Sequence, residues 1–106
     1  MKTPELNSVI MDIKSTLSQN PGPIKRVGVF GSLVKGRFTD NSDIDIAIEF
    51  EQGDAFDFER FVLFCEVCER ISESISSSYG RNVDLIHIED NPRCLLQEIN
   101  GEIVWI

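Results

Sequence analysis

Two short segments of this 106-residue sequence carry side chains suited to chemistry on phosphates. Gly31 and Ser32 follow the apolar-rich stretch 24–30, which predicts a strand that ends in a tight turn. Backbone N–H groups at such a turn, together with the serine hydroxyl, are suited to binding phosphate oxygens. After ten further residues, Asp43 and Asp45 begin an alternating strand pattern, so both carboxylates point to one face. Paired carboxylates are ligands for Mg²⁺ that also holds substrate phosphates, so the two segments predict phosphoryl or nucleotidyl transfer.

The stretch GSLVKGRFTDNSDIDIAIEF resembles the signature of the DNA polymerase beta-type nucleotidyltransferase superfamily. More narrowly, it is similar to the minimal nucleotidyltransferases of prokaryotes, and the resemblance extends from Val27 to about Ile88. The resemblance implies a third carboxylate on a later strand, and Asp84 stands in a mostly apolar stretch there. Leu33 departs from the family pattern, in which arginine is common at this position. That departure bears on the phosphate contacts and not on the metal site.

Aspartates inside strand patterns are the strongest indication of a metal site. Asp45 and Asp84 both interrupt otherwise apolar strands, where aspartate is disfavoured, so a functional role is favoured over ordinary turn or strand-end chemistry. In a two-metal arrangement, Asp43 and Asp45 bridge two Mg²⁺ ions. Asp84 then serves as a third ligand and takes the proton of the attacking hydroxyl. These three aspartates are the predicted catalytic residues, and the resemblance implies ATP as the substrate.

The predicted phosphate-binding residues have a plainer alternative. Gly31 lets the backbone approach the β- and γ-phosphates and Ser32 adds a hydroxyl, but a tight turn with a capping serine has the same composition. The spacing to Asp43 favours the functional interpretation. Lys35 and Arg37 are suited to neutralising triphosphate charge, and both also fit a solvated turn. Lys35 is kept as the third nucleotide-binding candidate.

A zinc site is the less favoured interpretation of the cysteines. Cys65 and Cys68 have the spacing of a metal or redox pair, and His87 and Cys94 would complete four ligands. Both members of the pair fall on the apolar side of a predicted helix, where cysteine behaves as a small hydrophobic residue. We therefore expect core cysteines and a partly buried strand histidine.

Helices and strands alternate along the predicted chain. The expected elements are a helix over 4–18 with Thr3 as N-cap, a strand over 24–30, a short helix over 32–36, a strand over 43–50, a long helix over 55–77 capped by Asp54, a third central strand over 81–88, a short helix capped by Asn91-Pro92 and closed by Gly101, and an edge strand over 102–106. This pattern predicts one domain, 1–106, of the α/β (α+β) class. The resemblance implies a small mixed β-sheet flanked by helices, as in the polymerase beta-like nucleotidyltransferase fold.

Two helices are expected to be amphipathic. The apolar stripe of the first comprises Leu6, Val9, Ile10, Ile13 and Leu17. The broad apolar side of the long helix comprises Phe58, Phe61, Val62, Phe64, Cys65, Cys68, Ile71 and Ile75.

The charge of the chain limits its partners. Eighteen acidic and ten basic residues give a formal charge of −8, which argues against binding duplex nucleic acid without a partner. Basic residues are concentrated around the Gly-Ser turn, whereas 39–59 contains acidic residues and no basic ones. This order fits a Mg²⁺–nucleotide site followed by an acidic surface available to a basic partner. Three cysteines, no signal-peptide pattern and no membrane-spanning apolar stretch predict a cytoplasmic protein.

The chain ends soon after the predicted catalytic core, so we expect the acceptor to be part of another molecule. The resemblance implies a partner of the HEPN type, an all-helical ribonuclease toxin, with AMP transferred from ATP to one of its tyrosines and this chain acting as antitoxin. One alternative is a non-catalytic subunit that neutralises its partner by contact. Another is nucleotidyl transfer to a small molecule, which the missing acceptor domain disfavours. Homo- or hetero-oligomers remain open at this stage.

Overall fold

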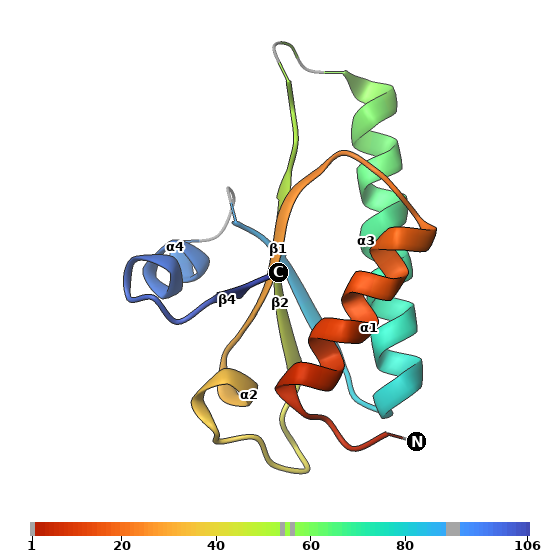
Figure 1. Ribbon diagram of the computed structural model, residues 1–106. Helices are drawn as coiled ribbons and strands as arrows, with labels where there is room; N and C mark the ends of the chain where they lie inside the picture. The colour runs from red at the N-terminus through yellow and green to blue at the C-terminus, as the bar shows by residue number, and fades with distance from the viewer. Residues whose placement is uncertain (1, 54, 56, 89–91) are drawn as a thin grey trace.

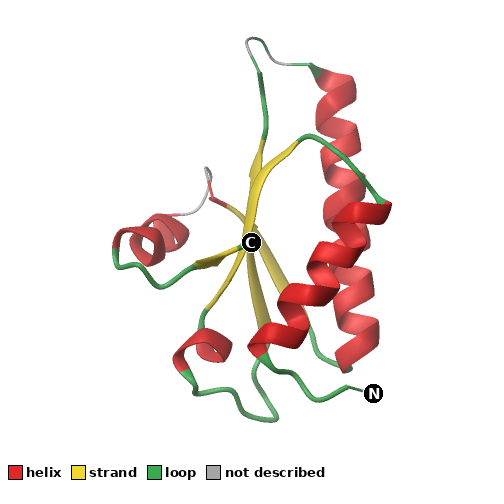
Figure 2. Cartoon of the chain, in the orientation of Figure 1, coloured by secondary structure: helices red, strands yellow, loops and turns green. Residues whose placement is uncertain are grey.

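The computed structural model describes residues 2–53, 55, 57–88 and 92–106. Its helices and strands alternate along the chain as predicted (Figures 1 and 2). In chain order they are α1 (Leu6–Gln19), β1 (Ile24–Phe30), α2 (Ser32–Lys35), β2 (Ile44–Phe50), α3 (Phe58–Tyr79), β3 (Val83–His87), α4 (Pro92–Ile99) and β4 (Val104–Trp105). The prediction for β1 is confirmed at both ends, and the other boundaries differ from the predicted ones by a few residues.

The described strands form one mixed sheet in the order β3-β2-β1-β4. Strand β1 is antiparallel to both β2 and β4, while β2 and β3 are parallel. Because parallel neighbours need a long crossover, α3 connects β2 to β3. The mixed sheet and the edge position of β4 confirm two predictions. The prediction of a third central strand over 81–88 is wrong, because β3 forms the other edge of the described sheet.

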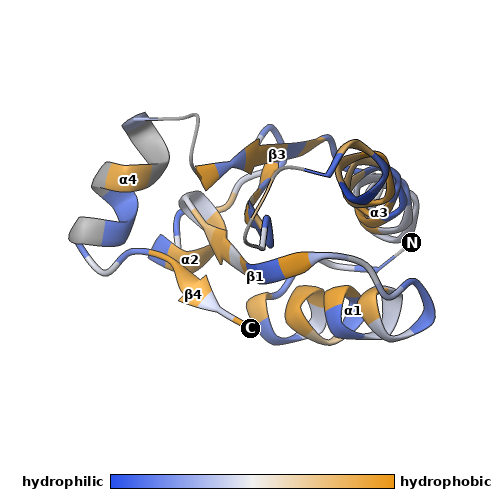
Figure 3. Cartoon of the chain, turned by 90° about the horizontal axis from the view of Figure 1, so that it is seen from above, coloured by the Kyte–Doolittle hydropathy of each residue, from blue (hydrophilic) through white to orange (hydrophobic). Residues whose placement is uncertain are grey.

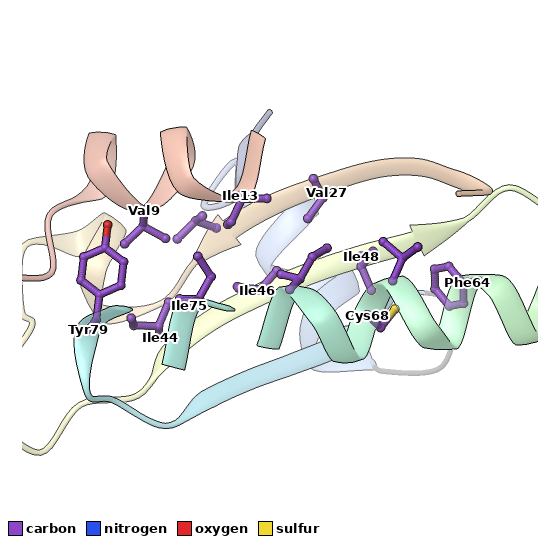
Figure 4. Close-up of a cluster of buried hydrophobic side chains, with 13 residues drawn as sticks. Val9, Ile13, Val27, Ile44, Ile46, Ile48, Phe64, Cys68, Ile75 and Tyr79 are labelled. Carbon is purple, nitrogen blue, oxygen red and sulfur yellow. The ribbon is translucent and has the colours of Figure 1, made fainter. Parts of the chain in front are cut away.

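Helices α1 and α3 pack on each other and cover one face of the sheet, whereas α4 lies on the opposite side (Figures 1 and 3). Alternation along β2 sends every second residue toward α1 and α3, and the first three of these are isoleucines. Figure 4 shows how side chains from these two helices and from β1 and β2 meet in this core. The buried members of the main core are Val9, Ile13, Val27, Val29, Ile44, Ile46, Ile48, Phe64, Val67, Cys68, Ile71, Ile75 and Tyr79. A smaller cluster on the opposite face contains Phe30, Ala47, Ile88 and Ile103.

The predicted stripe of α1 is confirmed, since its five apolar residues are buried or packed against the main core. The predicted apolar side of α3 is only partly correct. Phe58, Val62 and Cys65 are exposed, because their spacing of four and three residues places them on one flank of α3, beside the stripe that buries Phe64 and Ile71. Within the described ranges, neither α3 nor any other helix is long and apolar enough to cross a membrane.

Two of the predicted caps can be compared with the structure. Thr3 does not cap α1, which begins at Leu6 after Glu5, and Glu5 makes no side-chain capping hydrogen bond. Helix α3 begins later than predicted because Asp57 caps it and accepts hydrogen bonds from two N–H groups of its first turn at 2.9 and 3.3 Å. Gly101 ends α4 as predicted and donates its N–H to the Glu98 carbonyl at 3.0 Å. The predicted caps Asp54 and Asn91 lie outside the described residues.

Arg26 joins the two C-terminal elements to the centre of the sheet. Its guanidinium contacts Glu49 of β2 at 2.7 Å and Glu98 of α4 at 2.6 Å. The guanidinium also lies 4.0 Å from the ring centroid of Trp105 in β4. Burial alone would lower the pKa of Arg26, but the two carboxylates outweigh burial and raise this pKa, so the arginine stays charged.

Candidate active site

Gly31, in the turn after β1, lies in close contact with the carboxylate of Asp45. Its φ of 78° and ψ of −149° are accessible essentially to glycine alone. A Cβ atom at this position would overlap the carboxylate of Asp45. The antiparallel register explains the contact, because Phe30, the last residue of β1, pairs with Asp45. The predicted phosphate turn and one predicted metal ligand therefore lie side by side.

Asp45 and Asp84 are direct neighbours across the parallel pair β2–β3. Partners in register point to the same face and lie about 4.8 Å apart along the hydrogen-bonding direction. Their face is the one opposite α1 and α3, since Ala47, two residues after Asp45, belongs to the smaller cluster there. This arrangement places the two carboxylates together beside the Gly31 turn.

Asp43 lies in the connection just before β2, which begins at Ile44 and not at Asp43 as predicted. It is exposed, whereas Asp45 is half-buried. Among the residues that the structure describes, no group of three or more His, Cys, Asp or Glu side chains is close enough to hold a metal ion. The structure thus pairs Asp45 with Asp84 and leaves Asp43 on a neighbouring loop.

Ser32 opens helix α2, which is one residue shorter than the short helix predicted over 32–36. The Gly31 carbonyl accepts hydrogen bonds from Val34 and Lys35 at 3.1 and 3.0 Å, which closes the turn. The N–H groups of Ser32 and Leu33 stand at the start of the helix, where no preceding helical carbonyl can accept them. Ser32 therefore lies next to Gly31, whose turn contacts Asp45, at the position where the sequence predicts phosphate binding.

Lys35 does not point freely into solvent. Its ammonium lies 3.3 Å from a carboxylate oxygen of Glu102, in the segment between α4 and β4. The lysine predicted to bind the nucleotide is thus already paired with a carboxylate in this structure. Arg37, the other basic candidate, is exposed in the connection to β2.

Arg81, which is not among the predicted site residues, contacts the loop between α2 and β2. Its guanidinium donates to the carbonyl oxygens of Thr39 and Asp40 at 3.0 and 2.6 Å. It also lies 3.5 Å from the Asp40 carboxylate and 5.1 Å from the ring centroid of Phe38. These partners are about forty residues away in sequence, so no local pattern indicates the contact.

The zinc interpretation is not supported where it can be examined. Cys68 is buried as predicted, but Cys65 is exposed, so the pair does not face one site. His87 is a half-buried residue of β3, as predicted, and its ring lies edge-on to Phe64 with centroids 5.1 Å apart. The side chain of Cys94 lies outside the described part of the structure.

An open hollow of about 600 Å³ lies between α3 and the start of β3. None of the predicted site residues lines it; its lining comprises Ser72, Glu73, Ser76, Ser77, Asn82 and Val83. The candidate active site is therefore a surface at the turn, not this hollow.

Comparison with known protein families gives a match over residues 11–106 to the family described as polymerase beta, nucleotidyltransferase. The chain is 26% identical over 102 residues to the protein adenylyltransferase MntA of Thermococcus cleftensis, covering 96% of this chain and 93% of that one. It is 32% identical over 87 residues to a protein of Methanocaldococcus jannaschii described as a candidate protein adenylyltransferase, covering 81% of this chain and 79% of the relative.

Solved structures share the fold at lower identity. A structure described as a candidate minimal nucleotidyltransferase is 22% identical and covers 98% of both chains with a TM-score of 0.64. A chain of a toxin–antitoxin complex with AMP-PNP is 23% identical, with 90% of this chain and 69% of that one covered and a TM-score of 0.59. A chain from a tri-AMPylated Shewanella oneidensis HEPN toxin in complex with MNT antitoxin is 20% identical, with 94% and 70% covered and a TM-score of 0.54. These similarities show the fold.

Proposed function

Because this chain belongs to the polymerase beta nucleotidyltransferase family, we propose that it transfers AMP from ATP to a tyrosine of a HEPN-type ribonuclease toxin and acts as its antitoxin. The observation that carries this proposal is the meeting of the Gly31 turn with Asp45, which is itself in register with Asp84. Two relatives named for protein adenylyltransfer support the reaction class. Fold neighbours in a complex with AMP-PNP and in one with a tri-AMPylated HEPN toxin support the substrates.

The oxygen donors of the site fit Mg²⁺, which prefers carboxylates and substrate phosphates as ligands. Asp45 and Asp84 would hold the ions together with Asp43, and two ions are expected. When bound, Mg²⁺ neutralises charge on the phosphates and lowers the pKa of the acceptor hydroxyl. The close contact between Gly31 and Asp45 leaves no room for a side chain there, so phosphate oxygens and carboxylates can share one cation.

The remaining steps are carried by the chain's own groups. The N–H groups at the Gly31 turn and the hydroxyl of Ser32 hold the β- and γ-phosphates, and Lys35 adds positive charge once it leaves Glu102. The tyrosine oxygen forms a bond to the α-phosphorus, and the bond from that phosphorus to the α–β bridging oxygen breaks. Asp84 takes the phenolic proton, and pyrophosphate leaves.

The acceptor tyrosine comes from another molecule. The chain contains one tyrosine, Tyr79, which is only 1% exposed. Its hydroxyl donates a 2.7 Å hydrogen bond to Asp12, on the side of the molecule that faces α1. Tyr79 therefore cannot reach the carboxylates, which lie on the opposite face of the sheet.

The experiment compares covalent modification with simple binding. The partner toxin is incubated with this chain, ATP and Mg²⁺, then separated, and its intact mass and ribonuclease activity are measured. We expect added AMP and a ribonuclease that stays inactive after separation, because phosphate on a tyrosine is covalent and brings negative charge to the RNA site. Asp43→Asn is the matched control and should give neither effect.

Neutralisation by contact is the second candidate, and the formal charge of −8 favours it because it suits a basic RNA-binding face. In that case the separated partner has an unchanged mass and recovers its activity, and ATP makes no difference. That result would overturn the adenylyltransferase proposal.

A further inference from the structure

The segment that leads into β3 contacts the chain on both sides of Asp43. On one side, Arg81 donates to the carbonyl oxygens of Thr39 and Asp40 at 3.0 and 2.6 Å. On the other side, the carbonyl of Asn82 accepts the N–H of Ile44 at 2.9 Å. Asp43 lies between these two anchors, and it is the one predicted ligand that no strand pairing holds in place.

The 39–42 loop, which Arg81 contacts, is also held together by hydrogen bonds of its own. The Thr39 N–H donates to the Ser42 hydroxyl at 2.9 Å, and the Ser42 N–H donates to the Thr39 carbonyl at 3.1 Å. Because these hydrogen bonds tie Ser42 to Thr39, a contact that holds Thr39 in place also restricts the position of Asp43, the residue after Ser42. The guanidinium also lies over the Phe38 ring, so the planar group contacts the loop from two directions.

Arg81 is suited to this role by its burial and its place in the sheet. Its side chain is 20% exposed, although Asp40, its ionic partner, is fully exposed. The carbonyl contacts are therefore more important than the ion pair, which is exposed on one side and weak. Asp84, three residues after Arg81, lies beside Asp45, so one short segment supplies a carboxylate and orients a second one.

We propose that Arg81 is a positioning residue that holds the 39–42 turn and so keeps Asp43 just before β2, from where it can join Asp45 and Asp84 when the metal–nucleotide substrate binds. This inference rests on the proposed function. Residues that orient metal ligands typically contribute 10- to 100-fold to metal affinity. A role in direct phosphate binding is the competing explanation, because arginine is also a phosphate ligand.

The test measures the affinity of the chain for an ATP analogue with a non-hydrolysable α–β bridge, by calorimetry with Mg²⁺ and with a chelator. The ratio of the two dissociation constants gives the metal-dependent gain in affinity. In Arg81→Met this gain should fall about 10-fold or more, while affinity in the chelator stays unchanged. Arg81→Lys keeps the charge without the planar fork and should show a smaller loss; it also serves if Arg81→Met fails to fold. Arg70→Met, at an exposed arginine of α3, is the matched control and should leave the gain unchanged.

A double-mutant comparison tests whether Arg81 acts through Asp43. Asp43→Asn alone should lower the metal-dependent gain, and adding Arg81→Met should then lower it little further, since the two residues act on one contact. Equal losses from Arg81→Met in both backgrounds, or a loss in the chelator, would overturn the positioning role. An unchanged gain in Arg81→Met would do so as well. If the wild-type chain itself gains no affinity from Mg²⁺, the proposed function fails together with this inference.

Discussion

The backbone conformation of Gly31 and its closeness to Asp45 are two separate reasons why this residue is a glycine. The positive φ excludes most other residues on local grounds. The Asp45 carboxylate excludes a Cβ on grounds of space. Only the second reason concerns the site. Gly53 also has a positive φ but has free space around a Cβ, so a comparison of the two glycines distinguishes the two effects.

Gly31→Ala should reduce both stability and nucleotide binding. The backbone strain costs about 1–3 kcal/mol of unfolding free energy, and the new methyl group displaces the Asp45 carboxylate. The matched control is Gly53→Ala, since Gly53 has a φ of 77° and a Cβ there would meet nothing within 4 Å. Urea unfolding and calorimetry with the ATP analogue check both variants. We expect similar losses of stability and a loss of binding for Gly31→Ala alone; equal binding by the two variants would contradict the site.

The ion pair of Lys35 with Glu102 leads to a second prediction for single residues, which concerns nucleotide affinity. Glu102→Gln should strengthen nucleotide binding, because the lysine then gives up no ionic partner when phosphate arrives. The pair is partly exposed, so the gain should be about 0.2–1 kcal/mol, or up to roughly fivefold in the dissociation constant. Lys35→Met should have the opposite effect. Weaker binding in Glu102→Gln would mean that Glu102 orients Lys35 for the nucleotide.

At the scale of elements, α1 and α3 are joined by a polar contact at the end of their apolar interface. Tyr79 of α3 donates to the Asp12 carboxylate of α1 at 2.7 Å, and the ammonium of Lys2 contacts the same carboxylate at 3.0 Å. The Tyr79 hydrogen bond lowers the pKa of Asp12 below its usual 3.8; burial opposes this shift and Lys2 adds to it. Burial, helped by the nearby Asp12 charge, raises the pKa of Tyr79.

Tyr79→Phe should therefore destabilise the protein at neutral pH and much less in acid. A carboxyl whose pKa is lowered by folding stabilises the fold above its unfolded pKa, and this contribution is lost as the pH falls through the folded value. We expect a difference of about 1 kcal/mol between wild type and variant near pH 7. That difference should shrink below about pH 3.8, as measured by urea unfolding at several pH values. Lys2→Met, which removes an exposed ion pair, should have a smaller effect at neutral pH. A difference independent of pH would mean that the contribution of the Tyr79 hydroxyl does not depend on the charge of Asp12.

At the scale of the whole molecule, the sheet separates the helical core from the face that carries the carboxylates. Helices α1 and α3 bury Tyr79 on one side, while Asp45 lies on the other. The only tyrosine of the chain therefore cannot reach the carboxylates.

This separation predicts that the chain does not adenylylate its own tyrosine. Incubation of the chain alone with ATP and Mg²⁺ should leave the peptide that contains Tyr79 at its unmodified mass. The same preparation, mixed with its partner toxin, should add AMP to the partner, which serves as the positive control. An AMP group found on Tyr79 would contradict the burial of this side chain and the proposed transfer to a second molecule.

Local pattern was sufficient for the elements and for most of the candidate residues. Alternation along 43–50 predicts a strand with two unlike faces, and the Gly-Ser turn after β1 predicts the short helix that follows. These features depend on neighbours within a few residues, which a single sequence displays. The exposed Phe58, Val62 and Cys65 show the limit of such patterns, because periodicity does not tell how wide a stripe of a helix its neighbours cover.

The tertiary structure decided which distant residues meet. The register of β2 against β3 sets Asp45 beside Asp84, the order of the strands places β3 at an edge, and the contact of Gly31 with Asp45 depends on the pairing of β1 with β2. Arg81 reaches Thr39 only because α3 returns the chain to the loop before β2. Such contacts depend on strand order and register, which packing of the whole core sets. The sequence alone therefore determined the kind of chemistry, and the fold decided which side chains meet at the site.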